Sequence, residues 1–423
     1  MIYKMAFGDL AELRSVKVDP KNAQESFYIG LEHIEQQSLS LTGHGFGTDV
    51  DSQKQKFYAG DILFGKLRPY FRKVVIAPFD GICSTDIWVV IPKQGADRNF
   101  IFYWMASEEF ISSSTFASEG GRMPRAKWDW VCGFEIPNRT IEEQMAIGKI
   151  LRMLDEKIAI NKTISKTLGD MAQTIFKSWF IDFDPVKAKL AGEKPTGMND
   201  EAASHFPDSF VESELGLIPR GWEIKDAKDL FQIGIGRTPP RKESEWFCKG
   251  TEGIPWVSIR DMGNYNAFSH ATNEGLTAAA VERFKVPVVQ ENTVLMSFKL
   301  TVGKLCITDR PLVTNEAIAH FGVSEESVLD SYFAYLWLSN MDLGSLDSTS
   351  SIGTATNSTV LKQIKFLVPS ATITELFNKL SSPIFLQLKN LRRQSSNLEQ
   401  LRDALLPRLI SGELEIPVEM LKS

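Results

Sequence analysis

The sequence predicts an α+β protein in which two pseudo-symmetric α/β globular domains are combined with two long antiparallel helices that form a coiled coil. Three observations predict this architecture: an internal repeat of 232 residues, an apolar stripe with coiled-coil spacing after the first copy, and a leucine-rich stretch after the second. The length of 423 residues agrees with it, because a single hydrophobic core rarely extends beyond about 250–300 residues.

The repeat appears when the first half of the chain is moved forward by 232 residues. The matched pairs are Ile62 with Val294, Leu63 with Leu295, Tyr103 with Tyr335, Gly121 with Gly353, and Pro137 with Pro369. Small insertions change the register locally, so that residues 84–86 match residues 314–316. Each half ends in a short apolar strand closed by proline, followed by a long helix. Two copies of one structural unit explain matches that keep this order.

The first long helix is predicted over residues 140–180, where apolar residues recur at alternating three- and four-residue steps. This spacing is typical of a coiled-coil seam, and a buried asparagine in such a seam fixes register and partner. Thr140 followed by Glu143 also matches a capping box, which marks the start of the helix. The residues predicted to line the seam are Leu151, Leu154, Ile158, Asn161, Leu168, Ile175 and Trp179.

The second long helix is predicted over residues 374–409. Its seam is assigned to Ile384, Leu388, Leu391, Leu398 and Leu405, and Leu380 and Leu401 are placed on the same stripe. Pro383 predicts a kink or a late start, because proline removes a helical hydrogen bond. Antiparallel pairing of the two helices would place the domains at opposite ends of a rod, related by a pseudo-two-fold axis. Duplex DNA offers two half-sites in the matching opposite orientation.

The predicted division of the chain follows from these elements. It comprises a globular domain (1–139), a long helix (140–182), an acidic proline-containing linker (183–221), a second globular domain (222–369) and a C-terminal helix (370–423). Residues 181–215 hold eight acidic residues and three lysines, which accounts for all but one unit of the net charge of −6. The remainder is therefore nearly neutral, which permits local basic faces on the two domains.

Composition argues against membrane and secreted classes. No apolar run approaches the roughly 18 residues that span a bilayer, and the N-terminus lacks the apolar region of a signal peptide. The four cysteines lie far apart without metal-ligand spacing, so they are expected to be reduced thiols of a cytoplasmic protein.

Catalytic and metal-binding signals are absent from the sequence. Adenine methylation needs an Asp/Asn-Pro-Pro-aromatic motif, and the nearest candidate fails because Val186 follows Asp184 and Pro185. The glycine-rich stretches lack the strand–turn–helix context of a nucleotide loop. Asp61 and Asp86 are interpreted as turn residues in preference to a nuclease cluster. We therefore expect no metal site and no catalysis by this chain alone.

Two basic loops of the first half are candidates for nucleic-acid contact. Residues 65–73 contain four cations and two aromatic residues without an acid, and residues 120–127 form the second loop. Lysine and arginine neutralise phosphates, and arginine also forks onto guanine. A solvated surface loop gives the same pattern, so both interpretations stay open. The candidate residues are Lys66, Arg68, Tyr70, Arg72, Lys73, Arg122, Arg125 and Lys127 in the first domain, and Arg237, Arg241, Lys242, Arg260, Lys299, Lys304 and Asn357 in the second.

The segment between the domains resembles the inter-domain segment of the specificity subunits of type I restriction-modification enzymes. The residues that carry the resemblance are SWFIDFDPV (178–186), FPDSF (206–210), SELG (213–216) and IPRGW (218–222), with supporting matches at 60–63, 136–137, 142–144 and 254–262. The second half departs from the family after Pro369, where the Glu-Gln pair of the first half has no counterpart.

The resemblance implies a non-catalytic scaffold that reads DNA. In this family each target recognition domain reads one half of a split double-stranded site, and the helices set the spacer and bind two modification subunits. Those subunits carry S-adenosylmethionine, and restriction subunits that join the complex cut DNA with ATP and Mg²⁺, so this chain itself is expected to hold no cofactor. Two other classes stay open: a single-chain methyltransferase or nuclease with an unrecognised site, and a coiled-coil adaptor that binds only proteins.

Overall fold

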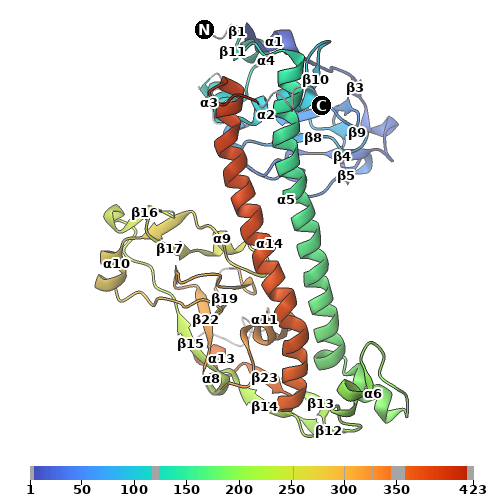
Figure 1. Ribbon diagram of the computed structural model, residues 1–423, viewed down its shortest axis with the longest axis vertical. Helices are drawn as coiled ribbons and strands as arrows, with labels where there is room; N and C mark the ends of the chain where they lie inside the picture. The colour runs from blue at the N-terminus through green and yellow to red at the C-terminus, as the bar shows by residue number, and fades with distance from the viewer. Residues whose placement is uncertain are drawn as a thin grey trace. The chain divides into compact units, whose positions relative to one another are not determined.

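The computed structural model describes residues 4–116, 123–250, 252–299, 301–324, 327–343 and 358–416 (Figure 1). The chain divides into two compact units, Met1–Ala159 with Ser395–Ser423, and Ile160–Gln394. Each long helix therefore contributes one part to each unit. In the described part of the chain, no helix is both long and apolar enough to cross a membrane.

The first unit is built on two sheets. The central antiparallel sheet has the order β2 (Ala11–Leu13), β10 (Ile87–Pro92), β7 (Ile62–Gly65) and β8 (Val74–Ile76). A five-stranded sheet has the order β3 (Lys17–Val18), β6 (Lys54–Phe57), β9 (Gly81–Cys83), β4 (Phe27–Ile29) and β5 (Gly45–Phe46), and β1 (Lys4–Ala6) pairs with β11 (Glu135–Pro137).

Four short helices and several 3₁₀ turns complete the first unit. The helices are α1 (Phe7–Leu10), α2 (Arg98–Ala106), α3 (Glu108–Phe116) and α4 (Trp128–Val131), and the turns are η1 (Pro20–Asn22), η2 (Leu31–His33), η3 (Gly47–Asp49) and η4 (Pro69–Phe71). The Asp97 carboxylate accepts from the Phe100 backbone N–H at 2.8 Å and so caps α2. Every residue of α2 from Phe100 to Ala106 is buried, which makes α2 the centre of this core.

The second unit repeats this plan. Its central sheet has the order β15 (Phe231–Ile235), β22 (Ile318–Val323), β19 (Val294–Ser297) and β20 (Leu305–Ile307), and a second sheet has the order β16 (Phe247–Lys249), β18 (Glu274–Leu276), β17 (Ile254–Val257) and β21 (Val313–Thr314). β14 (Glu223–Asp226) pairs with β23 (Lys365–Val368). The short helices are α8 (Ala227–Leu230), η6 (Ser244–Trp246), α9 (Ile259–Met262), α10 (Ala278–Arg283), α11 (Ser331–Ser339) and α13 (Ser358–Lys362).

The two central sheets confirm the repeat read from the sequence. The order β2-β10-β7-β8 corresponds strand by strand to β15-β22-β19-β20. β7 and β19 begin at Ile62 and Val294, the pair that the 232-residue shift brings together. Helices α2 and α11 contain the matched residues Tyr103 and Tyr335. The predicted fold class is therefore confirmed in its sheets as well as in its helices.

The long helices α5 (Ile141–Phe176) and α14 (Ala371–Ser411) pair in antiparallel fashion within each unit (Figure 1). In the first unit Arg139 contacts Ile410 and Asp155 contacts Arg402; in the second the Asn161 side-chain amide donates to Gln394 Oε1 at 2.8 Å. The predicted capping box is confirmed, because the Thr140 backbone N–H donates to Glu143 Oε2 at 2.9 Å and Glu143 N–H donates to Thr140 Oγ1 at 3.3 Å. A π-helical turn, η5 (Lys177–Ile181), follows α5.

The predicted seam residues differ in burial. Leu151, Ile158, Asn161, Trp179, Leu388 and Leu391 are buried, whereas Leu154, Leu168, Ile175, Ile384, Leu398 and Leu405 are half-buried. The placement of Leu380 and Leu401 on the stripe was wrong, because each is 46% exposed. The expected interruption at Pro383 was also wrong, since α14 continues through it. Pro383 and Lys379, whose carbonyl loses a donor, are both exposed, so water can replace the missing hydrogen bond.

The acidic segment 183–221 is folded onto the second unit. It contains α6 (Asp184–Leu190), α7 (Asp200–Ser204) and a hairpin of β12 (Phe210–Ser213) and β13 (Gly216–Pro219). Its residues Val186, Phe206 and Ile218 are buried in the same cluster as Trp179 and Phe180. This segment is therefore part of the core, although its proline content and lack of periodicity suggested an open linker.

A buried histidine makes the stability of the second unit depend on pH. His320 is 5% exposed, its Nε2 lies 2.7 Å from Thr314 Oγ1, and burial lowers its pKa to about 4. Between that value and the ordinary 6.5, the unfolded chain binds the proton more readily, so the unit should lose stability as the pH falls through this range. We expect thermal unfolding at pH 7.5, 6 and 5 to shift less with pH in His320→Gln than in the wild type. Equal shifts in the two proteins would assign the pH dependence to other groups.

Candidate nucleic-acid interface

The two basic loops of the first domain meet at one end of its central sheet. The Lys66 backbone N–H donates to the Asp86 carbonyl at 2.9 Å, and its carbonyl accepts from Ala126 N–H at 2.9 Å. Arg68 N–H donates to the Pro124 carbonyl at 2.8 Å. Backbone hydrogen bonds thus join three segments that are far apart in the sequence. We call residues 66–73, 84–86 and 123–127 the loop end of the first domain.

The first of these loops holds an unusual conformation. The 3₁₀ turn η4 lies between Arg68 and Arg72, whose φ angles of 53° and 47° are left-handed. Non-glycine residues occupy this region at a cost of order 1–3 kcal/mol, and they cluster at binding sites, where the surrounding structure holds them. Pro69 fixes the start of the turn, and Tyr70 at its middle is 44% exposed. The loop therefore presents an aromatic ring between two arginines.

The cations of this loop end differ in what they contact. Arg72 forms an ion pair with Glu108, and Arg125 forms a two-point pair with Asp86. The Lys73 ammonium donates to the Leu31 carbonyl at 2.5 Å, and burial lowers its pKa.

The remaining candidates of the first domain have no ionic partner within the described ranges. Lys66 is half-buried, Lys127 is exposed at the start of α4, and the Arg68 guanidinium lies 6.0 Å from the centre of the Phe71 ring. Arg122 lies outside the described residues. Lys66, Arg68 and Lys127 can therefore reach a ligand without breaking an ion pair.

A shallow depression adjoins the loop end. It has a volume of about 460 Å³ and is lined by Gln37, Tyr70, Arg72, Glu108, Ile111, Ser112, Thr115 and Phe116. Phe116 is 66% exposed, and Met123 nearby in the sequence is 57% exposed. Sequence reasoning missed these apolar residues, because only the spatial neighbourhood of Tyr70 marks Phe116 as part of the surface.

The second domain gathers a corresponding loop end from residues 236–242, 298–304 and 314–316, of which residue 300 is not described. Arg237 N–H donates to the Thr314 carbonyl at 2.9 Å, and Phe298 N–H donates to the Ala317 carbonyl at 3.0 Å. The Arg237 guanidinium also donates to the Phe284 carbonyl at 2.7 Å. The loop that follows β19 is thus the counterpart of the loop that follows β7.

The other candidates of the second domain fall into two groups. Lys242, Arg260 and Lys304 are exposed, and the Lys299 ammonium lies 5.2 Å from the centre of the Phe298 ring. Arg241 is held instead by Glu274, with Nη1 to Oε1 at 2.8 Å and Nη2 to Oε2 at 3.0 Å, and it stacks 4.4 Å from the ring centres of Phe247 and Trp256. Asn357 lies outside the described residues.

The aspartates considered for a nuclease cluster serve the local structure. Asp61 accepts from Arg14 at 2.8 and 3.1 Å and from the Tyr58 backbone N–H at 2.9 Å, which closes the turn before β7. Over the described ranges, no group of three or more His, Cys, Asp or Glu residues is placed to hold a metal ion. The four cysteines are free thiols, and burial raises the pKa of Cys83 to about 12.

Comparison with known families decides what this arrangement belongs to. The family model described as the type I restriction modification DNA specificity domain matches residues 3–169 and 219–399. The chain belongs to this family. The two matches include the two central sheets and much of both long helices, so the repeat in this family member is a repeat of the specificity domain.

Similar proteins carry the corresponding names. The chain is 29% identical over 415 residues to the type I restriction enzyme HindI specificity subunit of Haemophilus influenzae, covering 86% of this chain and 89% of that protein. It is 25% identical over 337 residues to the MjaIX specificity subunit of Methanocaldococcus jannaschii, covering 77% and 71%. The crystal structure of the type I restriction-modification S subunit from M. genitalium has the same fold, with a TM-score of 0.55 at 14% identity and coverage of 99% and 97%.

Proposed function

We propose that this chain is the DNA-binding specificity subunit of a type I restriction-modification complex and that each domain reads one half of a bipartite duplex target. One observation carries this proposal: the same sheet occurs twice, and each copy gathers basic loops at the same end. Loops that differ in chemistry on a common scaffold suit the recognition of two different half-sites.

The proposed partners are double-stranded DNA, two modification subunits and, through these, restriction subunits. S-adenosylmethionine, ATP and Mg²⁺ are assigned to the partner subunits, so the chain alone is proposed to be non-catalytic and to hold no cofactor. The names of the similar proteins, which are specificity subunits, support this assignment. The long helices are proposed to set the spacer between the half-sites.

The candidate residues divide by their accessibility. We propose that exposed ammonium groups such as Lys127, Lys242 and Lys304 contact phosphates, which positions the domains without reading sequence. Tyr70 and Arg68 are proposed to face the grooves, because the strained loop holds them apart from other partners. Lys73 ranks last, since its ammonium already has a buried partner.

The proposal is tested by methylome sequencing of a host that expresses the chain with its modification subunit. We expect a bipartite modified-adenine motif, and we expect exchange of residues 1–139 for those of another family member to change only one half. A chain that binds the modification subunit but produces no motif would favour the adaptor interpretation. Turnover by the purified chain alone, with DNA and S-adenosylmethionine or Mg²⁺, would favour an enzyme.

A further inference from the structure

The ion pair between Asp86 and Arg125 leaves one edge of a guanidinium open. Arg125 Nε donates to Asp86 Oδ1 at 2.8 Å, and Nη2 donates to Oδ2 at 3.2 Å. This side-on geometry uses the edge formed by Nε and Nη2. The opposite edge, formed by Nη1 and the second hydrogen of Nη2, keeps two parallel donors. With 48% of its side chain exposed, Arg125 can offer that edge to a ligand.

Asp86 is itself held in place. Its carbonyl accepts from Lys66 N–H at 2.9 Å, and its own N–H donates to Ser84 Oγ at 3.2 Å. The Asp86 side chain is 26% exposed, and its carboxylate lies within the loop end of the first domain. The carboxylate therefore fixes the orientation of the Arg125 guanidinium before any ligand arrives, which reduces the entropy lost on binding.

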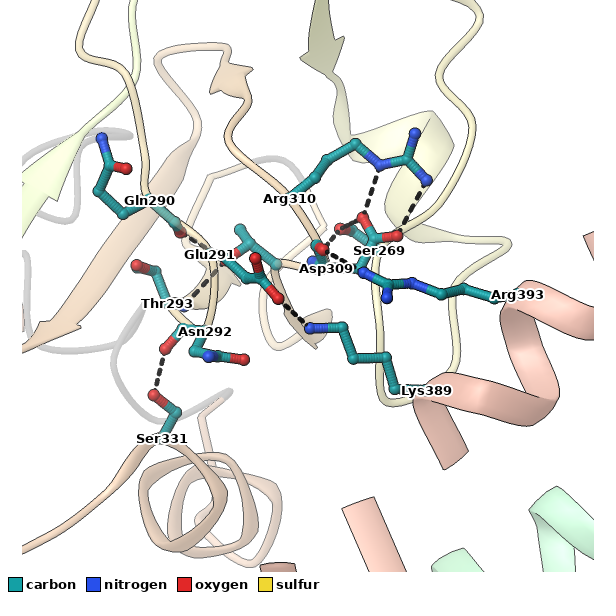
Figure 2. Close-up of polar contacts among 11 residues, drawn as sticks. Ser269, Gln290, Glu291, Asn292, Thr293, Asp309, Arg310, Ser331, Lys389 and Arg393 are labelled. Carbon is teal, nitrogen blue, oxygen red and sulfur yellow. Dashed lines mark hydrogen bonds and ion pairs between the residues drawn. The ribbon is translucent and has the colours of Figure 1, made fainter. Parts of the chain in front are cut away.

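Two other arginines show that neither exposure nor pairing alone gives this arrangement. Arg241 meets Glu274 through Nη1 and Nη2, so its end-on edge is already occupied. Arg310 meets Asp309 side-on, with Nε to Oδ1 at 3.1 Å and Nη2 to Oδ2 at 3.0 Å, and its side chain is 57% exposed (Figure 2).

Arg310 nevertheless lies at the wrong end of its sheet. It follows β20, whereas the loop end of the second domain precedes β20 and β22. Figure 2 shows Arg310 and Asp309 beside Arg393 and Lys389 of α14, where Arg393 Nη2 donates to the Asp309 carbonyl at 3.1 Å. Among these three pairs, only Arg125 combines a free end-on edge with a position at a loop end.

We propose that Arg125, oriented by Asp86, reads a guanine in the major groove of the first half-site. Guanine presents N7 and O6 as two adjacent acceptors, which match the two donors of the open edge. Adenine presents an N6 donor beside N7, so the same edge would meet a donor. A bidentate contact of this kind discriminates between bases by about 5- to 150-fold. This inference rests on the proposed function and names the base that one of its residues recognises.

The pair should contribute little to nonspecific binding. A carboxylate next to the guanidinium makes the pair nearly neutral, so a phosphate gains less from it than from an isolated cation. Replacing Asp86 by asparagine should therefore act in two opposite directions. Discrimination at the guanine should fall because Arg125 is no longer oriented, while affinity for unrelated DNA should rise because a negative charge is lost. A role in folding alone would lower both.

The test uses the chain assembled with its modification subunit and begins with the wild-type motif. In binding assays with each base substituted in turn, we expect Arg125→Gln to lose about 5- to 150-fold discrimination at one guanine of the first half-site. We expect Asp86→Asn to relax the same position and to raise nonspecific affinity. Arg310→Gln, the matched control, should leave both half-sites unchanged. Hydrogen exchange of residues 62–92 checks that each variant is folded.

Other outcomes separate this inference from the proposed function. Uniform weakening over all sequences would make Arg125 a phosphate contact, and a first half-site without guanine would also overturn the inference, while the proposed function stands in both cases. Absence of any bipartite motif in the wild type would contradict the proposed function itself. If Arg125→Gln does not fold, Asp86→Asn decides, because a fall in both specific and nonspecific binding would leave only a structural role.

Discussion

Removal of the Asp155 carboxylate is expected to destabilise the first unit by about 3–5 kcal/mol, because it leaves a buried arginine without its main partner. Arg402 of α14 is 6% exposed, and its Nη1 donates to Asp155 Oδ1 at 2.7 Å. The hydroxyl of the fully buried Tyr103 donates to Asp155 Oδ2 at 2.5 Å. In Asp155→Ala, a cation and a phenol both lose this acceptor, and Asp403 is left as the only described ionic partner of Arg402.

The effect can be assigned with a double replacement and a surface control. Thermal unfolding of the full chain, with hydrogen exchange of residues 98–106, reports on the first unit. Glu156→Ala removes the exposed pair with Arg152 and should cost less than about 1 kcal/mol. Combining Asp155→Leu with Arg402→Met should recover most of the loss, since an apolar pair needs no compensation. A small effect of Asp155→Ala would mean that water solvates Arg402.

Periodic features of the fold could be predicted because they are local. The step of the apolar stripe predicts a helix, and the buried Asn161 lies on it as expected. The repeat could be found because β7 and β19 keep the same spacing from their flanking elements. Leu380 and Leu401 were misplaced because seven-residue counting continues past the point where other residues, such as Phe377 and Leu406, turn toward the core.

The composition of the site could be read from the sequence, but its assembly could not. Basic residues announce the loops at 66–73 and 123–127, yet nothing in the sequence predicts the hydrogen bond between Arg68 and Pro124. That contact depends on how the chain returns after α3. The same limit hid the pairing of Asp86 with Arg125, because an isolated acid carries no periodicity and its partner lies 39 residues away.

Charge reversal in the first loop is expected to weaken binding to all DNA sequences. In the double variant Lys66→Glu and Arg68→Glu, two proposed backbone contacts become repulsive. Each lost phosphate contact should reduce the slope of log affinity against log salt by about 0.9, and we expect the assembled complex to lose about a hundredfold in affinity near physiological salt. Lys66 and Arg68 have no described ion-pair partner, so the change should leave the fold intact.

The control for this variant is Lys21→Glu, which makes the same reversal elsewhere on the first domain. Lys21 is exposed in η1, which precedes β4, whereas the loop end lies beyond the other end of the parallel strands β4 and β9. Equilibrium binding over a salt series should therefore show an unchanged slope for Lys21→Glu. If the double variant also kept the wild-type slope, the loop would be a solvated surface and the domain would have to meet DNA through another face. A reduced slope together with an unchanged methylated motif would identify both residues as phosphate contacts, leaving base recognition to residues such as Arg125.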